Sequence, residues 1–457
     1  MGYDGNTANK FKMSKGLRTT LFIFFVTAFV IGAPALALYA QGYRINWPLE
    51  AGKKLIVKTG GLFVKVSPKQ IAIYVDGQME KQTDFFFDSA LVTNLLPRLH
   101  QVQIKKNGYQ TWEKNLEVKE KEVVEAKNIF LFPEPANIDF PIAEKNIDDF
   151  MLSPDKKKIA LRYQDEAGLV IKSHDIAGGI TIKLIDQSNF AIKDPKFGGW
   201  KWLDEKTLEI WATGGEIVET YSVIIDKTPP QIIKKSDTPS ITATAENTTA
   251  AQELAAAQAG DARYYLADDG SVYRAGTGET PTQAIAAKMD IQPQTEYALW
   301  IFGNYYFVKA DTELFVAQKN SANFEKILKG ASANPKISPN GQKIAYWSDS
   351  EIWILYLENK NDQPTAKAGD KIFIARLSEK ITDCDWFNSD YLVFAAGDKI
   401  KTAEIDNRDK INFADLAQIS KITKQEQNVV ARMFMNQNQK TVYLFANNTL
   451  YKSEPIE

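Results

Sequence analysis

The strongest constraint on the fold is a weak internal repeat that runs from about residue 137 onward. Residues 147–162 read IDDFMLSPDKKKIALR, and residues 334–348 read NPKISPNGQKIAYWS. In both segments an apolar residue precedes Ser-Pro, a polar turn follows, and an Ile-Ala strand comes next. Looser copies of this hairpin begin at Trp200, Cys384 and Arg432. Such self-similarity indicates that the chain repeats one small supersecondary unit.

The spacing of the copies indicates the architecture. They begin near residues 147, 197, 290, 332, 381 and 428, a period of about 40–50 residues with one double gap. A hairpin pattern at residues 264–274 fills that gap and predicts a degenerate copy. Up to four short strands per repeat predict a β-propeller of about seven blades over residues 137–457, because each blade hides one sheet face against the next. Six or eight blades, or a pair of β-sandwich domains, are the alternatives.

Two segments interrupt the repeat. Residues 238–260 are rich in Thr and Ala, and we expect a mobile insertion there, although residues 250–259 also suit a short helix. Residues 359–370 predict a polar hairpin loop. Loops on one face of a propeller often carry its contacts, and the alternative is that both segments are tolerated insertions without a role. A propeller also needs its first and last blades joined, so we expect residues 449–453 to pair with a strand around residues 136–142.

The N-terminal region contains a long apolar run. Residues 21–40 read LFIFFVTAFVIGAPALALYA and carry no charge, a length that suits a helix crossing a bilayer core of about 30 Å. Four basic residues precede the run, so the positive-inside rule predicts a cytoplasmic N-terminus. We therefore expect a basic cytoplasmic tail at residues 1–20, a transmembrane helix at residues 21–43, and a single-pass cell-membrane protein whose bulk is extracytoplasmic. The expected membrane-anchor residues are Leu21, Phe25, Phe29, Pro34 and Leu38.

A cleaved signal peptide is the alternative for this run. Small residues at positions 35–37 and 38–40 fit a cleavage site, although the run exceeds the usual apolar region of about 7–15 residues. Pro34 lies inside the run, where we expect it to kink the helix.

Residues 60–133 predict a small domain of short strands. Apolar residues alternate at positions 62–66, 71–75 and 100–104, and the dipeptides Asp76-Gly77 and Asn107-Gly108 are hairpin turn signals. Strands at this spacing fit a compact antiparallel β-sandwich. We expect Tyr109 and Trp112 to be packing anchors in its small core.

This small domain resembles the PEGA domain of bacterial surface proteins. The resemblance rests on the run SPKQIAIYVDG at residues 67–77, which is similar to the family's S-x-P-x-x-A-x-V-Y-V-D-G hairpin, and on a later hairpin that ends in Gly-Tyr. Ile71 and Leu99 replace glycines of the family pattern. It implies a non-catalytic surface module, often placed between a membrane anchor and other domains. The matching positions, whose role is structural, are Pro68, Ala72, Asp76, Gly77, His100, Gly108 and Tyr109.

The repeat region has a resemblance of its own. The copies that read Ser-Pro, four residues and then Ile-Ala or a close variant resemble the WD-like repeats of TolB-type propellers and of the propeller domain in prolyl oligopeptidases. A peptidase of that class needs a hydrolase domain with a G-x-S-x-G elbow. The chain contains no such pattern.

The composition includes few of the residues that catalytic and metal sites commonly use. The 457 residues include two histidines and one cysteine, too few for a histidine-rich or multi-cysteine metal site. The phosphate-loop and dinucleotide-binding glycine patterns are absent. We expect His100 and Cys384 to be buried structural residues and His174 to lie in a surface turn. The sequence therefore predicts no enzyme, no catalytic residue and no cofactor.

The charged and aromatic residues argue against three further kinds of site: a metal site, a nucleic-acid surface and an aromatic binding mouth. Neighbouring carboxylates at 148–149, 268–269 and 383–385 lack the order of a calcium loop, so we expect turn formers and no metal site. The 55 basic and 57 acidic residues leave a net charge of -2, which gives no basic field for nucleic acid. Seven of the nine tryptophans follow residue 190, and we expect them to pack between blades rather than line a binding mouth.

These observations favour a membrane-anchored extracytoplasmic binding or scaffold protein. Its propeller would dock another protein of the envelope or surface, or an envelope polymer. A structural component of a larger envelope assembly is the alternative, and a hydrolase or lyase that uses propeller carboxylates is a remote one.

Overall fold

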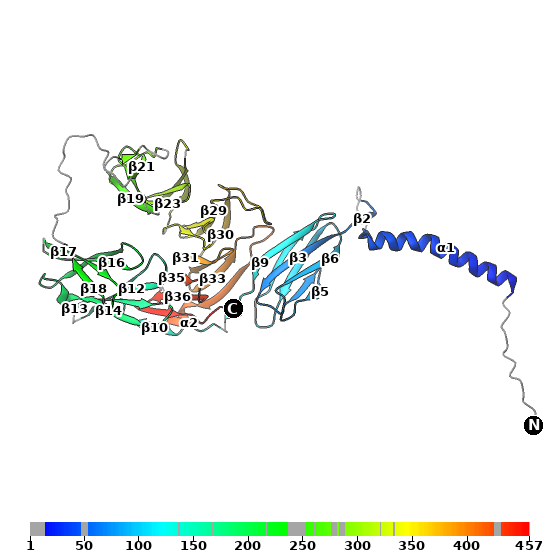
Figure 1. Ribbon diagram of the computed structural model, residues 1–457, viewed down its shortest axis with the longest axis horizontal. Helices are drawn as coiled ribbons and strands as arrows, with labels where there is room; N and C mark the ends of the chain where they lie inside the picture. Colours follow the sequence, from blue (N-terminus) through cyan, green and yellow to red (C-terminus); the bar gives the residue numbers. More distant parts are fainter. Residues whose placement is uncertain are drawn as a thin grey trace, which may run out of the picture. The chain divides into compact units, whose positions relative to one another are not determined.

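The computed structural model describes residues 14–46, 54–135, 138–165, 168–215, 217–235, 253–259, 262–275, 281–282, 288–319, 321–331, 334–424 and 431–456. The chain divides into two compact units. Unit 1 comprises Met1–Lys106 and Thr111–Phe130, and unit 2 comprises Asn107–Gln110 and Leu131–Glu457. Strands dominate both units outside one long helix, which confirms the all-β class (Figure 1).

Unit 1 begins with the long helix α1 (Lys15–Ala40), capped by the Ser14 hydroxyl, which accepts a hydrogen bond from the Leu17 amide. None of its residues is buried, and its most apolar stretch has a mean hydropathy of 2.5. By length and composition α1 can cross a membrane. The predicted limits of 21–43 were wrong at both ends. The Ser14 cap starts the helix earlier, and Gly42, at a φ of 84°, turns the chain away after Ala40.

Three small sheets complete unit 1. A short hairpin follows α1, and two larger sheets form the small domain, in the spatial orders β6-β3-β9 and β5-β4-β7-β8. The hairpin strands are β1 (Tyr43–Ile45) and β2 (Ile56–Lys58). The first larger sheet contains β3 (Gly60–Ser67), β6 (Ser89–Leu95) and β9 (Val123–Phe130). The second contains β4 (Ala72–Val75), β5 (Gln78–Gln82), β7 (Leu99–Lys105) and β8 (Trp112–Glu117).

Alternating apolar residues build the core between these two sheets. Leu62 and Val64 on β3, and Val102 and Ile104 on β7, are almost fully buried, as the period of two predicts. The expectation of a purely antiparallel sandwich was wrong for one pair, because β9 runs parallel to β3. The chain reaches β9 from β8 in the other sheet, so it crosses over and enters beside β3 in the same direction.

The first predicted hairpin turn is present between β4 and β5. Asp76 and Gly77 have φ angles of 50° and 80°, and Val75 pairs with Gln78 across the turn. Positive φ at both central residues defines the primed two-residue turn that Asp-Gly favours. The Asp76-Gly77 prediction of a hairpin is therefore confirmed.

Gly77→Val should lower the local free energy of unfolding by about 1 kcal/mol or more, because a β-branched residue resists positive φ. A Cβ at this glycine meets no atom within 4 Å, so the loss of stability reflects backbone strain and not a steric clash. Hydrogen-exchange protection of the β4 and β5 amides measures the loss. Gly77→Asn is the matched control and should lose less, because Asn tolerates the left-handed region. Equal losses in the two variants would contradict this explanation.

Unit 2 contains seven four-stranded antiparallel sheets within its described residues, which confirms a propeller of seven blades (Figure 1). Blade 1 is β11 (Asp149–Leu152), β12 (Lys158–Asp165), β13 (Gly168–Asp175) and β14 (Thr181–Asp186). Blade 2 is β15 (Lys196–Trp202), β16 (Thr207–Gly214), β17 (Ile217–Ile224) and β18 (Gln231–Lys234). Blade 3 is β19 (Glu253–Ala259), β20 (Ala262–Ala267), β21 (Val272–Ala275) and β22 (Pro281–Thr282).

The remaining blades follow in chain order. Blade 4 is β23 (Tyr297–Phe302), β24 (Tyr305–Ala310), β25 (Glu313–Gln318) and β26 (Glu325–Lys329). Blade 5 is β27 (Lys336–Ile337), β28 (Lys343–Trp347), β29 (Glu351–Tyr356) and β30 (Lys371–Arg376). Blade 6 is β31 (Ile381–Asn388), β32 (Tyr391–Ala396), β33 (Lys399–Glu404) and β34 (Phe413–Gln418). The short helices are η2 (Gln187–Asn189) and α2 (Ile419–Thr423).

Blade 7 joins the two ends of the repeat region. It contains β35 (Arg432–Asn436), β36 (Thr441–Ala446), β37 (Thr449–Lys452) and the early strand β10 (Ile142–Lys145). Ile142 pairs with Tyr451, and the Glu454 amide donates to the Asp139 carbonyl at 3.0 Å. The predicted closure is confirmed, with the early strand a few residues later than expected. Figure 1 shows green β10 beside the red strands of this blade.

Apolar side chains fill the spaces between neighbouring blades. Trp347 of blade 5 and Trp386 of blade 6 belong to one buried cluster, and both are almost fully buried. Phe434 and Tyr443 of blade 7 stack at 4.7 Å between ring centroids and share a cluster with Ile159 of blade 1. The positions of Trp347 and Trp386 support the expectation that tryptophans pack between blades.

The Ala-rich segment differs from its prediction. Residues 253–259, expected to lie in an insertion or a short helix, form β19, which pairs with β20 from Glu253↔Ala267 to Ala259↔Ala262. The ladder with β20 and the packing of Ala255 and Ala257 against the neighbouring cluster override the helix propensity of alanine. The rest of the expected insertion, residues 238–252 and 260, lies outside the described residues.

Candidate functional site

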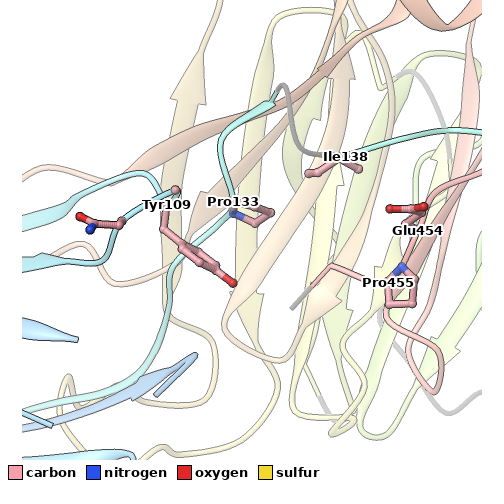
Figure 2. A pocket seen from close by; sticks show the side chains of 7 residues that line it. Tyr109, Pro133, Ile138, Glu454 and Pro455 are labelled. Carbon is pink, nitrogen blue, oxygen red and sulfur yellow. The ribbon is translucent and has the colours of Figure 1, made fainter. Parts of the chain in front are cut away.

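A pocket of about 630 Å³ lies in unit 2, where three chain segments meet. The volume falls within the range of about 300–1,000 Å³ that small-ligand sites occupy. The lining residues are Asn107, Gly108, Tyr109, Pro133, Ile138, Glu454 and Pro455. Figure 2 shows Tyr109 and Pro133 on one side of this pocket and Glu454 and Pro455 on the other.

The first wall is the turn at Asn107–Gln110. Gly108 has a φ of 78°, which places its carbonyl to accept from the Glu134 amide at 2.9 Å. The Gln110 amide donates to the Phe132 carbonyl at 2.8 Å. These bonds hold the turn against the following segment like a short extra strand, so the Tyr109 ring has a defined place.

The Gln110 side chain fixes the turn further. Its Nε2 donates to the Pro133 carbonyl at 3.1 Å and to the Asp415 carbonyl of β34 at 2.8 Å. Its Oε1 accepts from the Asp415 amide at 3.3 Å. One amide side chain therefore ties this wall to the backbone of blade 6.

The opposite wall extends the closing blade. Glu454 bonds through its amide to Asp139, and the Ile456 amide donates to the Lys440 carbonyl at 2.9 Å. Ile456 is completely buried. Glu454 and Pro455 are thus exposed residues on a backbone that is held on both sides.

The walls combine apolar and polar surface in similar amounts. Tyr109, Pro133, Ile138 and Pro455 provide the apolar surface, whereas Asn107 and Glu454 provide polar side chains. Among the described residues no cation pairs with the Glu454 carboxylate. A pocket that contains an aromatic ring, apolar side chains and one carboxylate suits an apolar group next to a cation.

The structure divides the residues of the PEGA-like motif between the units. Gly108 and Tyr109 group with unit 2 and line the pocket, so the expectation that Tyr109 anchors the small core was wrong. The bonds of the 107–110 turn to residues 132–134 explain the change. The motif residues that remain in unit 1 are Pro68, Ala72, Asp76, Gly77 and His100. Sequence reasoning missed Ile138, Glu454 and Pro455, because only the blade closure brings them to Tyr109.

His100 and Asp76 form a polar network inside unit 1. His100 is buried, its Nδ1 lies 2.9 Å from Asp76 Oδ2, and its Nε2 lies 2.8 Å from the Leu96 carbonyl. Arg98 also reaches Asp76 Oδ2 at 2.9 Å. Burial raises the pKa of Asp76, but the hydrogen bond and charge of His100, with the Gln101 amide and Arg98, outweigh it and hold the pKa below its usual value. The network therefore stabilises the fold above the ordinary Asp pKa and is lost as pH falls through the lowered one.

A second polar cluster joins blades 6 and 7. Asp383 and Asp385 on β31 accept from the Met433 and Met435 amides of β35, each at 2.9 Å. Between them Cys384 is fully buried, as expected, and burial holds the pKa of its thiol well above the usual value. These carboxylates hold neighbouring blades together. No group of three or more metal-ligating side chains occurs among the residues that the structure describes.

The prediction for His174 was wrong. His174 was expected in a surface turn but lies buried in β13, with Nδ1 at 2.9 Å from Thr181 Oγ1. The reason is that β13 continues to Asp175 and pairs with β14.

The expected membrane-anchor residues all lie in α1. Of these, Phe25 and Phe29 are 63% and 72% exposed. The other expected anchor residues, all within the same helix, are Leu21, Pro34 and Leu38.

Comparisons with known proteins add similarities of fold only. No family model and no curated protein matches the chain. YCF48 from Cyanidioschyzon merolae is similar, with a TM-score of 0.39 and 9% identity over 70% of this chain and 98% of that chain. The β-propeller domain of Cps50 (Swd1) from Myceliophteria thermophila is similar, with a TM-score of 0.40 and 7% identity over 70% of this chain and 99% of that chain. At this level neither similarity bears on activity or partners.

Proposed function

We propose that the protein is a membrane-anchored extracytoplasmic binding scaffold whose propeller docks another envelope or surface protein, or an envelope polymer. In this proposal the small domain is a PEGA-like module of the bacterial cell envelope, the propeller is TolB-like, and the chain is not an enzyme. The N-terminus is cytoplasmic, and both β-rich parts lie outside.

Helix α1 carries the proposal. It has 26 residues and none of them is buried. Exposed apolar surface of this extent is unstable in water and needs a bilayer or a partner. Lys15 and Arg18 lie in its first turn, which favours a cytoplasmic start under the positive-inside rule.

The pocket supports docking by the propeller. Its walls are held by backbone bonds on both sides, so a partner meets a preformed surface. The Glu454 carboxylate, on the opposite side of the pocket from the Tyr109 ring, favours a partner segment that places a lysine or arginine next to an apolar side chain.

Protease added to intact, wall-stripped cells tests the topology. We expect removal of both β-rich parts and survival of a short fragment that contains α1. Full protection of the chain would contradict the extracytoplasmic placement.

Glu454→Lys should reduce recovery of a partner more than about tenfold, because it replaces the attracting charge of the pocket with a repelling one. Affinity purification of the full chain from native membranes, with quantitative mass spectrometry, measures recovery. The matched control is Glu205→Lys, the same change at an exposed residue between β15 and β16. Equal recovery with wild type and both variants would remove the pocket from the docking surface. Recovery of ordered arrays of this chain alone would favour a structural assembly component.

A further inference from the structure

A two-stranded hairpin follows directly after α1 in unit 1 (Figure 1). Its first strand, β1, begins three residues beyond Ala40, the last residue of α1. The two strands pair antiparallel in the register Tyr43↔Lys58, Arg44↔Val57 and Ile45↔Ile56. Because successive residues of a strand point to opposite faces, the first and third pairs share one face of the hairpin, and the middle pair lies on the other.

The face with the middle pair is engaged inside unit 1. Val57 is buried. Arg44 Nη2 donates to Asn94 Oδ1 at the end of β6 at 3.0 Å, and its Nη1 donates to the Tyr39 carbonyl of α1 at 2.8 Å. The Arg44 guanidinium also lies 3.5 Å from the centroid of the Tyr39 ring. One side chain therefore links the hairpin both to the last turn of α1 and to β6.

The opposite face of the hairpin is apolar and exposed. Ile45 and Ile56 lie across from each other on this face and are 66% and 51% exposed. On the same face, Lys58 Nζ lies 5.5 Å from the centroid of the Tyr43 ring. Adjacent exposed aliphatic side chains on a paired backbone mark an interaction surface.

The short link to α1 indicates what covers this surface. Three residues of chain span at most about 10 Å. The headgroup layer extends about 5–8 Å beyond the hydrocarbon core on each side of a bilayer. If α1 crosses the membrane with its apolar run in that core, β1 therefore begins in or just above the headgroup layer.

The charge of the hairpin is complementary to an anionic lipid surface. Residues 41–46 and 54–59 contain three basic residues, Arg44, Lys54 and Lys58, and no acidic residue. Lys54 is exposed. Basic residues close to a membrane are attracted by anionic headgroups, and tyrosines such as Tyr43 are enriched at this depth.

We propose that the exposed face of the β1–β2 hairpin lies in the lipid headgroup layer of the membrane that α1 crosses. Ile45 and Ile56 enter the layer, and the ammonium groups of Lys54 and Lys58 bind lipid phosphates. Because Arg44 joins the hairpin to α1 and to β6, this contact sets the orientation of the small domain on the membrane. The inference rests on the proposed membrane anchor and adds a lipid-binding surface to it.

Depth-dependent fluorescence quenching of the full chain tests the contact. The chain is reconstituted in vesicles of phosphatidylcholine and phosphatidylglycerol, with an environment-sensitive fluorophore attached to Ile45→Cys. We expect apolar-type emission and quenching by spin-labelled lipid that exceeds that of the control by more than about threefold. The native Cys384 is fully buried, so it should not react.

Phe86→Cys is the matched control, because Phe86 is also an exposed apolar residue of the small domain, at 77%. It precedes the start of β6, whereas Asn94, which Arg44 contacts, lies near the end of that strand. The length of β6 separates the two ends by about 20 Å. Solvent-like emission from position 45, or quenching there no stronger than at position 86, overturns the proposal.

Charge reversal provides a second measurement. Lys54→Glu and Lys58→Glu should each shift the labelled hairpin away from the anionic vesicles, by about fivefold in the docking equilibrium that quenching at position 45 reports. Lys81→Glu, the same change at an exposed residue of β5, is the control and should leave this quenching unchanged. Equal quenching in all three variants contradicts contact between the lysines and the lipid.

Carbonate extraction of the wild-type chain separates failure of this inference from failure of the anchor. A carbonate-resistant chain whose label at position 45 stays in water refutes the hairpin contact alone. A chain that carbonate releases refutes the membrane anchor and the hairpin contact together.

Discussion

Leu450→Asp should destabilise the propeller by about 3–5 kcal/mol, because it buries a charge without a partner in the central strand of the closing blade. Leu450 is completely buried and pairs with Phe445 on one side and Glu144 on the other. Disruption of β37 therefore separates β10 from β36 as well. The expected result is a sharply lower melting temperature of unit 2, measured by calorimetry of the full chain.

Ile142→Asp is the matched control for this variant. It makes the same kind of change in the same sheet, but Ile142 lies on the edge strand β10 and is 49% exposed. Its effect should stay within about 1 kcal/mol, since surface changes away from special features are small. Small and equal effects of the two variants would show that the β10–β37 junction does not hold the propeller together.

Phe25→Arg should impair membrane insertion by roughly 3 kcal/mol, the cost of an arginine at the centre of a transmembrane helix. Phe25 lies well inside α1 and is exposed there. The full chain should shift from the carbonate-resistant membrane fraction to the extractable fraction. Val26→Arg, a separate variant that places one charge at nearly the same depth, should cause the same shift.

Tyr39→Arg serves as the control for insertion. Tyr39 lies at the last turn of α1, where a long basic side chain reaches the interface and its cost falls. Retention of Tyr39→Arg with loss of Phe25→Arg fits a transmembrane span. Retention of both variants would contradict it and favour attachment through another surface.

The sequence predicted the elements that local patterns define. Asp76-Gly77 specifies its turn by the φ angles that these two residues tolerate, and alternating residues such as Leu62 and Val64 specify the buried face of β3. The repeat predicted the blades for the same reason, since each hairpin carries its own turn and apolar pattern. Even the degenerate copy at residues 264–274 corresponds to strands of blade 3.

Apart from the closure of the propeller by β10 and β37, features that depend on distant partners were predicted poorly. Residues 253–259 are strong helix formers in isolation, and only the β20 ladder makes them a strand. Tyr109 follows a turn that looks local, yet Gln110 bonds to Asp415, about three hundred residues away. The pocket combines this turn with Glu454, so no single stretch of sequence contains its signal.

The closing blade sets the order in which this chain can finish folding during synthesis. Strand β10 leaves the ribosome early, and its partner β37 follows only after roughly three hundred further residues. For that whole interval β10 lacks its ladder partner β37. Long-range pairing of this kind is slow and exposes chains to aggregation. If the chain is exported as it is made, the nascent propeller passes through this open state on the far side of the membrane. The yield of folded propeller should then depend on extracytoplasmic chaperones and on uninterrupted translation as far as Lys452.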